Sequence, residues 1–377
     1  MDELVTPRLQ SVVFRCDAAL FIGNGHVMRC LTLADAIAAM GIKCTFICRE
    51  FEGHLGPTIT QRGHDLRLLP KPTSEAMARI GDDGPYTGWL GTSVEQDAAQ
   101  TATIIKKTGA DRVITDHYAI NADWHSMAAP TGIPIFAIDD LANRTHACDV
   151  LLDQNLGRKE EDYAGLVDPS TISLIGPKYA LLKPEFAEKR ASSLLRRRSS
   201  TLRKILVSMG GVDADDATSK VINTLNHAEL PIETEITIVL GPSAPHKEAV
   251  RQRAATMPYP TEFKENVSDM ASLMASADLA IGAMGSTAWE RCCLGLPILA
   301  LVVADNQNSA AAALEATGAG LLLGNLSDPE WTGKLEAGLE QAKVPETLEC
   351  WSLRAANVCD GKGSQRVLAH ILPELVQ

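Results

Sequence analysis

The chain has 377 residues, of which 45% are hydrophobic, so it is long and apolar enough to fold as two ordinary globular domains. Its formal net charge of −12 argues against a general affinity for nucleic acid or for an anionic membrane surface. That charge still permits one anionic small molecule, held by a few local donors.

The first ten residues, MDELVTPRLQ, are polar and carry two acids, so no signal peptide is expected. No stretch of sequence is long and apolar enough to predict a membrane span. The nine cysteines include no CxxC pair of the kind that binds zinc. We therefore expect a cytoplasmic protein with free thiols. We also expect that it is a monomer and that its ligand is a small molecule.

In the N-terminal half, short β-rich runs alternate with helical patterns. Predicted helices cover residues 26–40 and 95–107. Alternation of this kind predicts βαβ crossovers and a parallel sheet covered by helices on both faces. Predicted strands are 11–16, 43–50, 111–116, 133–140 and 148–155.

A basic, serine-rich stretch at 189–204 then predicts a linker, and the alternation resumes after it. The expected fold class is α/β, with two Rossmann-like domains facing a cleft. The expected boundaries are an N-terminal domain at 11–188, a C-terminal domain at 205–345 and a closing helical segment at 346–377. Predicted strands of the second half lie within 204–211, 234–241, 261–266, 277–285, 297–302 and 320–324.

The stretch FIGNGHVMRC, residues 21–30, places a tight turn at the mouth of a helix. Gly23 and Gly25 permit backbone angles and close approaches that side chains would prevent. His26 would lie on the first helical turn, where the positive end of the helix favours an uncharged imidazole suited to act as a base. Arg29 would share that face of the helix. The alternative is an ordinary glycine turn followed by a packing histidine.

Acids and amides follow three neighbouring strands of the first domain. Asp116, His117 and Tyr118 follow one strand, the pair at 139–140 follows the next, and residues 153–155 follow the third. Because the carboxyl ends of parallel strands meet at one edge, these side chains predict a lining for sugar hydroxyls. They lack compact metal-ligand spacing, so neither a metal nor any other cofactor is expected.

The segment at 277–297 predicts a buried strand, a glycine-bearing turn and a helix. Ser286 and Thr287 are expected as helix N-caps and hydrogen-bond donors, an arrangement that suits a diphosphate. Glu290 would then accept hydrogen bonds from a ribose diol. Caps of this type also occur without any ligand. The same site is predicted to include Gly210, Gly211 and Gly285, and a loop at 263–270 whose Phe263 and Val267 frame a base. The polar run Asp305, Asn306 and Gln307 lies beside the predicted diphosphate turn and is predicted to bind the sugar.

These motifs, taken in order over about residues 12–325, resemble the pseudaminic-acid-pathway hydrolases of the PseG type. That family cleaves UDP-2,4-diacetamido-2,4,6-trideoxy-β-L-altropyranose and is similar to the GT-B glycosyltransferases. The matching stretches are FRCDAALFIGNGHVMRCLTLADAI, RGH, WLG, DHY, AIDDLANRTHACDVLLDQN, LIGPKYALLKPEF, VSMGGVD, GSTAWERCCLGLP and ADNQ. Met284 departs from the pattern, since a small residue is expected at that position.

The resemblance implies that His26 corresponds to the family's essential histidine and acts on the hydrolytic water. It also implies that Tyr118 and Asn306 help to hold the sugar. It places the ribose and diphosphate beside Glu290 and the turn at 285–287, with UDP in the C-terminal domain and the sugar in the N-terminal one. The expected reaction is metal-independent hydrolysis with inversion at the anomeric carbon.

Three other functions stay open at this point. A GT-B glycosyltransferase would pass the sugar to an acceptor alcohol instead of water. A hydrolysing UDP-sugar 2-epimerase would release a sugar with altered stereochemistry at C2. A non-catalytic nucleotide-sugar-binding protein would bind the ligand without consuming it.

Overall fold

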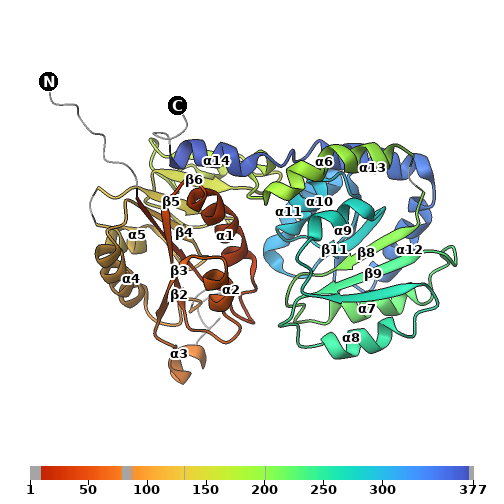
Figure 1. Cartoon of the computed structure of the whole chain (residues 1–377), viewed down its shortest axis with the longest axis horizontal. Helices are drawn as coiled ribbons and strands as arrows, with labels where there is room; N and C mark the ends of the chain where they lie inside the picture. The colour runs from red at the N-terminus through yellow and green to blue at the C-terminus, as the bar shows by residue number, and fades with distance from the viewer. Residues whose placement is uncertain (1–9, 79–85, 87, 131, 200, 373–377) are drawn as a thin grey trace. The chain divides into compact units, whose positions relative to one another are not determined.

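In a computed structural model, the chain forms two α/β units, each built on one parallel sheet (Figure 1). This confirms the predicted α/β class. The structure describes residues 10–78, 86, 88–130, 132–199 and 201–372. Unit 1 comprises Met1–Gln154, Arg158–Ile175 and Ser364–Gln377, and unit 2 comprises Asn155–Gly157 and Gly176–Gly363.

The sheet of unit 1 has seven strands in the order β3-β2-β1-β4-β5-β6-β7. All neighbouring strands are parallel, and the direction of strand order reverses between β1 and β4. In open sheets of this type, ligands bind beyond the carboxyl ends of the strands at such a reversal. The strands are β1 (Ser11–Cys16), β2 (Lys43–Arg49), β3 (Asp65–Leu69), β4 (Arg112–Asp116), β5 (Ile135–Ile138), β6 (Val150–Asp153) and β7 (Ile172–Ile175).

Helices cover both faces of this sheet, with α1 on one face and α4 and α5 on the other (Figure 1). The amphipathic pattern of α4 explains its position, because Ala98 and Ile105 are fully buried while Glu95, Lys106 and Lys107 are exposed. Ser93 caps its N-terminus and Gly109, at a φ of 60°, ends it. The helices are α1 (Gly25–Ala38), α2 (Gly56–Gln61), α3 (Ser74–Ala78), α4 (Val94–Thr108), α5 (Ala122–Ala128), η1 (Glu160–Tyr163) and α14 (Gly363–Ile371), the last of which starts one residue before the unit boundary.

The sheet of unit 2 has six parallel strands in the order β10-β9-β8-β11-β12-β13, and its strand order reverses between β8 and β11. Two apolar clusters fill the space on its two faces, each made of strand and helix side chains. The strands are β8 (Lys204–Ser208), β9 (Glu235–Leu240), β10 (Thr261–Glu265), β11 (Leu279–Ala283), β12 (Ile298–Val302) and β13 (Gly320–Asn325).

The helices of unit 2 alternate with its strands, as βαβ crossovers require. None of the helices in the described part of the chain is long and apolar enough to cross a membrane. The helices are η2 (Pro177–Tyr179), α6 (Pro184–Arg196), η3 (Arg197–Ser199), α7 (Ala217–Leu225), α8 (Lys247–Ala254), α9 (Met270–Ser276), α10 (Thr287–Cys293), η4 (Asp305–Gln307), α11 (Asn308–Thr317), α12 (Trp331–Ala342) and α13 (Pro345–Ala356).

Every predicted strand is present, with ends that differ from the prediction by no more than a few residues. Two strands were not predicted, β3 and β7, and both lie at an edge of the first sheet. Leu68 and Ile172 in these strands are exposed, at 41% and 46%. An edge strand buries little of its surface, so it lacks the unbroken apolar run that marks a central strand.

The boundaries of the two units differ from those of the predicted segments, which were 11–188, 189–204, 205–345 and 346–377. The stretch predicted as a linker is largely the helix α6 and the turn η3, both in unit 2. Not all the charged side chains of this stretch are exposed to solvent. Arg197 is 2% exposed, and its guanidinium donates to the carbonyl oxygens of Met274, Ala277 and Leu294.

The predicted closing segment is also divided, since α13 belongs to unit 2 and almost all of α14 to unit 1. Most of the N-terminal stretch predicted to lack a signal peptide, at 1–9, lies outside the described residues. So do Ser200 of the predicted linker and residues 373–377 of the closing segment.

Two buried histidines of unit 1 predict a loss of stability in acid. Burial lowers the pKa of His125 to about 3 and of His146 to about 4, and their rings lie 5.7 Å apart. Because the unfolded chain binds these protons near pH 6.5, stability is full above that pH and falls as the pH drops toward 4. The free energy of chemical unfolding, measured between pH 7.5 and 4.5, should show this fall. In His125→Gln the number of protons taken up on unfolding should be lower by about one, so the free energy should depend less steeply on pH.

His227 provides the control for this experiment, since it is exposed on unit 2. His227→Gln is expected to leave the pH slope of the wild type unchanged. Equal slopes for the two variants would show that His125 is not the group that takes up a proton on unfolding.

Candidate functional site

His26 lies on the first turn of α1, directly after the loop that follows β1. Gly23 has a φ of 83°, in the left-handed region that favours glycine, so the loop turns sharply there. Asn24 occupies the N-cap position without a side-chain cap hydrogen bond. The loop therefore brings His26 to the carboxyl end of β1, beside the reversal of strand order.

The ring of His26 is buried, with 6% of the residue exposed. Burial lowers its pKa to about 4, against the opposing effect of the Asp116 carboxylate. The imidazole is therefore uncharged at neutral pH, as expected from the sequence. Its Nδ1 atom has no hydrogen-bond partner among the described residues. A neutral ring with an unpartnered nitrogen is chemically able to accept a proton.

Arg29 lies one helical turn after His26 and is held between two carboxylates. Its Nε and Nη2 donate to Asp116 at 2.5 and 2.6 Å, and its Nη1 donates to Asp140 at 2.9 Å. The hydroxyl of Tyr118 donates to the same Asp140 at 2.8 Å. The structure thus brings together the predicted residues Arg29, Asp116 and Tyr118, with Arg29 in ion pairs with Asp116 and Asp140, and Gly25 lies one turn before Arg29 on α1. Their contact with a sugar stays a prediction.

Tyr118 and His117 are neighbours in sequence but face different surroundings. The Tyr118 ring packs edge-on against His26, with centroids 4.5 Å apart. His117 is 1% exposed, accepts from the Ala119 amide at Nδ1 and places Nε2 3.3 Å from the Asp17 carboxylate. His117 was predicted to bind sugar, whereas the contacts of its ring nitrogens within unit 1 are those of a packing residue.

An aromatic cluster surrounds His26 that the sequence patterns did not indicate. Trp89 stacks on Tyr118 with centroids 5.6 Å apart, and Tyr86 packs edge-on against both rings. Phe21, 39% exposed, extends the cluster edge-on toward Trp89. Because Trp89 lies far from His26 in the sequence, no local pattern linked the two. We expect this cluster to supply apolar surface beside the histidine.

In unit 2, the predicted diphosphate turn connects β11 to α10. Ser286 does occupy the N-cap position, but its side chain forms no cap hydrogen bond. Thr287, predicted as a second cap, instead accepts from the guanidinium of Arg291 at 3.1 Å. Glu290 is partly buried, and this burial raises its pKa to about 7. The cap hydroxyl of Ser286 is therefore available to another partner.

Met284 stands where the sequence pattern predicts a small residue, so its longer side chain needs space near this turn. It is 4% exposed and belongs to an apolar cluster of unit 2, so its side chain is accommodated in the core. A Cβ added at Gly285 would meet no atom within 4 Å, so the space beside the turn is open. The turn therefore keeps room for a ligand.

The predicted base-binding loop at 263–270 is partly a strand. Phe263 lies within β10, packs against the core of unit 2 and has the Arg251 guanidinium 4.7 Å from its ring centroid. Val267 is partly buried against the second apolar cluster. Gly210 and Gly211 do follow β8, beside the reversal of strand order, and Gly210 has a φ of 104°. These glycines and the turn after β11 thus follow neighbouring strands.

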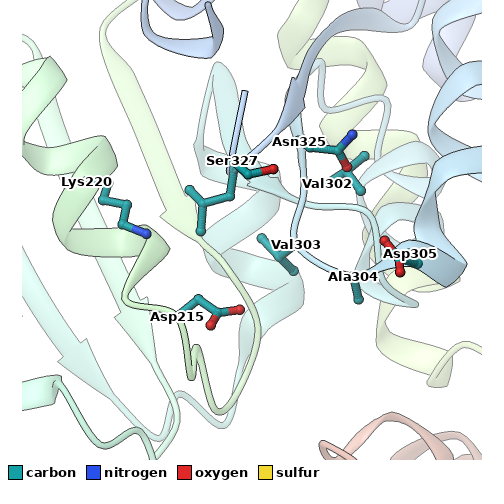
Figure 2. A pocket seen from close by; sticks show the side chains of 9 residues that line it. Asp215, Lys220, Val302, Val303, Ala304, Asp305, Asn325 and Ser327 are labelled. Atoms are coloured by element: carbon teal, nitrogen blue, oxygen red, sulfur yellow. The ribbon is translucent and has the colours of Figure 1, made fainter. Parts of the chain in front are cut away.

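The predicted residues Asp305, Asn306 and Gln307 form the short helix η4. Asp305 contributes to an open pocket of about 360 Å³ beyond the carboxyl ends of β12 and β13. In Figure 2 the carboxylate of Asp215 and the amine of Lys220 lie on one side of this pocket and Asp305 on the other. Gln307 is used locally, since its Oε1 accepts from the Val303 amide at 3.1 Å. The pocket is lined by Asp215, Lys220, Val302, Val303, Ala304, Asp305, Asn325, Leu326 and Ser327.

Among the residues that the structure describes, no three His, Cys, Asp or Glu side chains are grouped so that they could hold a metal ion. The buried carboxylates of unit 1 are paired with arginines instead, as Asp116 is with Arg29 and Asp153 with Arg158. Their charges are thus compensated within the protein.

No protein-family model matches the chain. It is 26% identical over 301 residues to the UDP-2,4-diacetamido-2,4,6-trideoxy-beta-L-altropyranose hydrolase of Campylobacter jejuni, covering 80% of this chain and 94% of that protein. It is also 35% identical over 206 residues to the spore coat polysaccharide biosynthesis protein SpsG of Bacillus subtilis. That match covers 54% of this chain and 58% of SpsG, so it spans little more than half of that relative.

Among solved structures, MurG of Acinetobacter baumannii superposes with a TM-score of 0.65 at 16% identity, covering 97% of this chain and 99% of MurG. Other solved neighbours are glycosyltransferases, including one that acts in lipopolysaccharide biosynthesis. The chain therefore has the GT-B fold, and its sequence resemblance to the pseudaminic-acid-pathway hydrolases is confirmed.

Proposed function

We propose that the chain is a hydrolase that cleaves the anomeric C–O bond of a UDP-linked 2,4-diacetamido-2,4,6-trideoxyhexose. The products are UDP and the free sugar, with inversion at the anomeric carbon, as a step in pseudaminic acid biosynthesis. The observation that carries this proposal is the buried, uncharged imidazole of His26 at the start of α1, whose Nδ1 has no hydrogen-bond partner in the described part of the chain. The similarity to the Campylobacter hydrolase supports the choice of substrate.

The proposed mechanism needs a base and a stabilised leaving group. UDP is a good leaving group because its charge spreads over a diphosphate, so it needs electrostatic stabilisation more than a proton. The transition state resembles an oxocarbenium ion, and water attacks the face opposite the departing UDP. His26 takes the proton of that water, a contribution of about 10²–10⁴ in rate. Attack from the opposite face produces inversion.

In this proposal unit 1 binds the sugar and unit 2 binds UDP. The sugar-binding residues of unit 1 include Tyr118 and Arg29. The residues of unit 2 that we propose to bind UDP are Gly210, Gly211, Phe263, Val267, Gly285, Ser286, Thr287 and Glu290. The positions of Gly210, Gly211 and the turn at 285–287 support this, since they follow the neighbouring strands β8 and β11, and ligands of such sheets bind at the carboxyl ends of the strands where the strand order reverses.

Mass spectrometry of the products formed in ¹⁸O-water tests the reaction. The label is expected in the free sugar and not in UDP, because water attacks carbon and not phosphorus. Label in UDP would overturn the proposed bond cleavage. UDP release that begins only after an acceptor alcohol is added would favour the glycosyltransferase instead.

Glu290 offers a test of the nucleotide site. A hydrogen bond to a charged group contributes about 1.5–3 kcal/mol, so Glu290→Ala should weaken UDP binding by about 10- to 100-fold. Because burial raises the pKa of Glu290 to about 7, its ionised form increases as the pH rises through 7. Wild-type affinity for UDP should therefore rise over pH 6–8, and the variant should lose this dependence. Isothermal titration calorimetry measures both effects.

Ser286→Ala should also weaken UDP binding, since its cap hydroxyl is available to a ligand. Glu340→Ala, an exposed carboxylate on α12, is the matched control and should bind UDP as the wild type does. Unchanged affinity in both site variants would place the nucleotide elsewhere.

A further inference from the structure

Two exposed apolar side chains lie at the tip of the loop that leads to His26. Leu20 is 40% exposed and Phe21 is 39% exposed. The loop is closed on itself, because the Gly23 amide donates to the carbonyl oxygen of Ala19 at 2.8 Å. Single exposed apolar residues need no explanation, but neighbouring ones beside a candidate catalytic residue point to a ligand.

The ring of Phe21 is connected to the ring of His26 by the indole of Trp89. Phe21 and Trp89 meet edge-on with centroids 6.2 Å apart, and the centroids of Trp89 and His26 lie 6.4 Å apart. Phe21 also packs edge-on against Phe51, at 5.3 Å. These contacts hold the exposed ring in a defined orientation. We call Phe21, Phe51 and Trp89 the aromatic wall.

The exposed end of the aromatic wall is purely apolar. Phe51 is 3% exposed, so Phe21 presents more of its surface to solvent, and a phenyl ring has no hydrogen-bonding atom. A methyl group gains free energy when it leaves water for such a surface. A hydroxyl group would exchange its hydrogen bonds to water for none, which is costly. This end of the wall therefore favours a methyl group.

The sugar of the proposed substrate carries one apolar substituent of this kind, the methyl group at C6. Its two acetamido groups also end in methyls, but each contains an amide that needs hydrogen-bond partners. C6 is bonded to C5, and only the ring oxygen separates C5 from the anomeric carbon. A surface that adjoins His26, the base proposed to act at the anomeric carbon, is therefore within reach of the C6 methyl.

We propose that Phe21, supported by Trp89, determines specificity for the C6 methyl group of the sugar. This inference rests on the proposed function and deepens it. The aromatic wall selects a 6-deoxy sugar over the same sugar with a hydroxyl at C6. An apolar surface discriminates against an added hydroxyl by about 100-fold at most. Phe21 exchanges no proton in the reaction, so its effect is on the choice of substrate.

Two UDP-linked diacetamido sugars that differ only at C6, methyl against hydroxymethyl, test this selection. The wild type should prefer the 6-deoxy sugar by about 10- to 100-fold in kcat/KM. Phe21→Ala should lower this ratio by about tenfold, mainly through slower reaction of the 6-deoxy sugar. Phe21→Leu keeps an apolar side chain and should retain most of the preference. Met127→Ala, at a 43% exposed apolar position on α5 of the same unit, is the matched control and should keep the wild-type ratio.

Saturation-transfer NMR of the free 2,4-diacetamido-2,4,6-trideoxyhexose gives a second measurement that needs no turnover. Saturation of the aromatic protons of the protein should reach the C6 methyl more strongly than the acetyl methyls, because the proposed contact is with a phenyl ring. Phe21→Ala should remove this difference, and Met127→Ala should retain it.

An unchanged substrate ratio in Phe21→Ala would overturn the proposal and leave hydrolysis intact. So would an equal loss of activity on both sugars, since that would reflect a general disturbance of the loop before His26. If the wild type released UDP from neither sugar, the proposed function would fail. A C6 methyl signal that still depended on Phe21 would then leave the inference about the aromatic wall standing.

Discussion

Replacement of His26 by glutamine is expected to lower the rate of UDP release by about 10²–10⁴-fold, the usual contribution of a general base. Glutamine is polar and of similar size, but its amide does not accept a proton at neutral pH. The affinity for UDP should stay within a few-fold of the wild type, because the residues proposed to bind UDP lie in unit 2. Initial rates of UDP release and calorimetric binding of UDP measure the two quantities.

The control is His227→Gln, which removes an exposed histidine and should leave both rate and affinity unchanged. Near-normal turnover in His26→Gln would show that another group activates the water. A parallel loss of UDP affinity would show instead that His26 acts in binding.

Asp97→Ala is expected to lower the free energy of unfolding by about 3–5 kcal/mol, the effect of removing one partner from a buried ion pair. Asp97 is fully buried on α4 and accepts from the guanidinium groups of Arg15 and Arg49 at 2.8 and 2.6 Å. It also accepts from the Trp124 indole at 2.9 Å. Among the described residues, its removal leaves Arg49 with no carboxylate partner and Arg15 with Asp17 as its one carboxylate partner. Urea unfolding followed by circular dichroism measures the change.

Glu95→Ala on the same helix is the matched control, because Glu95 is exposed in the first turn of α4. Its effect should stay within about 0.5 kcal/mol, as is usual at surface positions. A loss of similar size in both variants would mean that the effect comes from removing a carboxylate in the first turn of α4, and not from the buried ion pairs of Asp97.

The central strands of both sheets could be predicted because they are buried on both faces, which leaves an unbroken apolar run in the sequence. β1, SVVFRC, is an example, and all six of its residues are buried. The edge strand β3, DLRLL, has only one buried residue, so its pattern is mixed. The basic stretch before β8 was misleading for a different reason. Arginine donors such as those of Arg197 can be satisfied by backbone carbonyls inside the protein, and charge alone does not reveal this.

The candidate site was partly predictable for a similar reason. Sequence patterns place carboxylates at the ends of strands, but they do not show which way each side chain points. Asp139 accepts from the Tyr163 hydroxyl and pairs with Arg144, whereas its neighbour Asp140 binds Arg29 and Tyr118. Neighbouring residues of extended chain point to opposite sides, and this alternation is the signal that would have separated the two.

The division of the chain into units limits how this protein can be cut. Unit 1 takes residues from both ends of the sequence, because α14 returns to it from the C-terminus. Val367 and Leu372 in that returning segment are fully buried. A recombinant fragment ending at residue 188 would therefore expose apolar surface that α14 covers in the intact chain. A stand-alone unit 1 would need a fusion that joins residues 364–372 directly to residue 175.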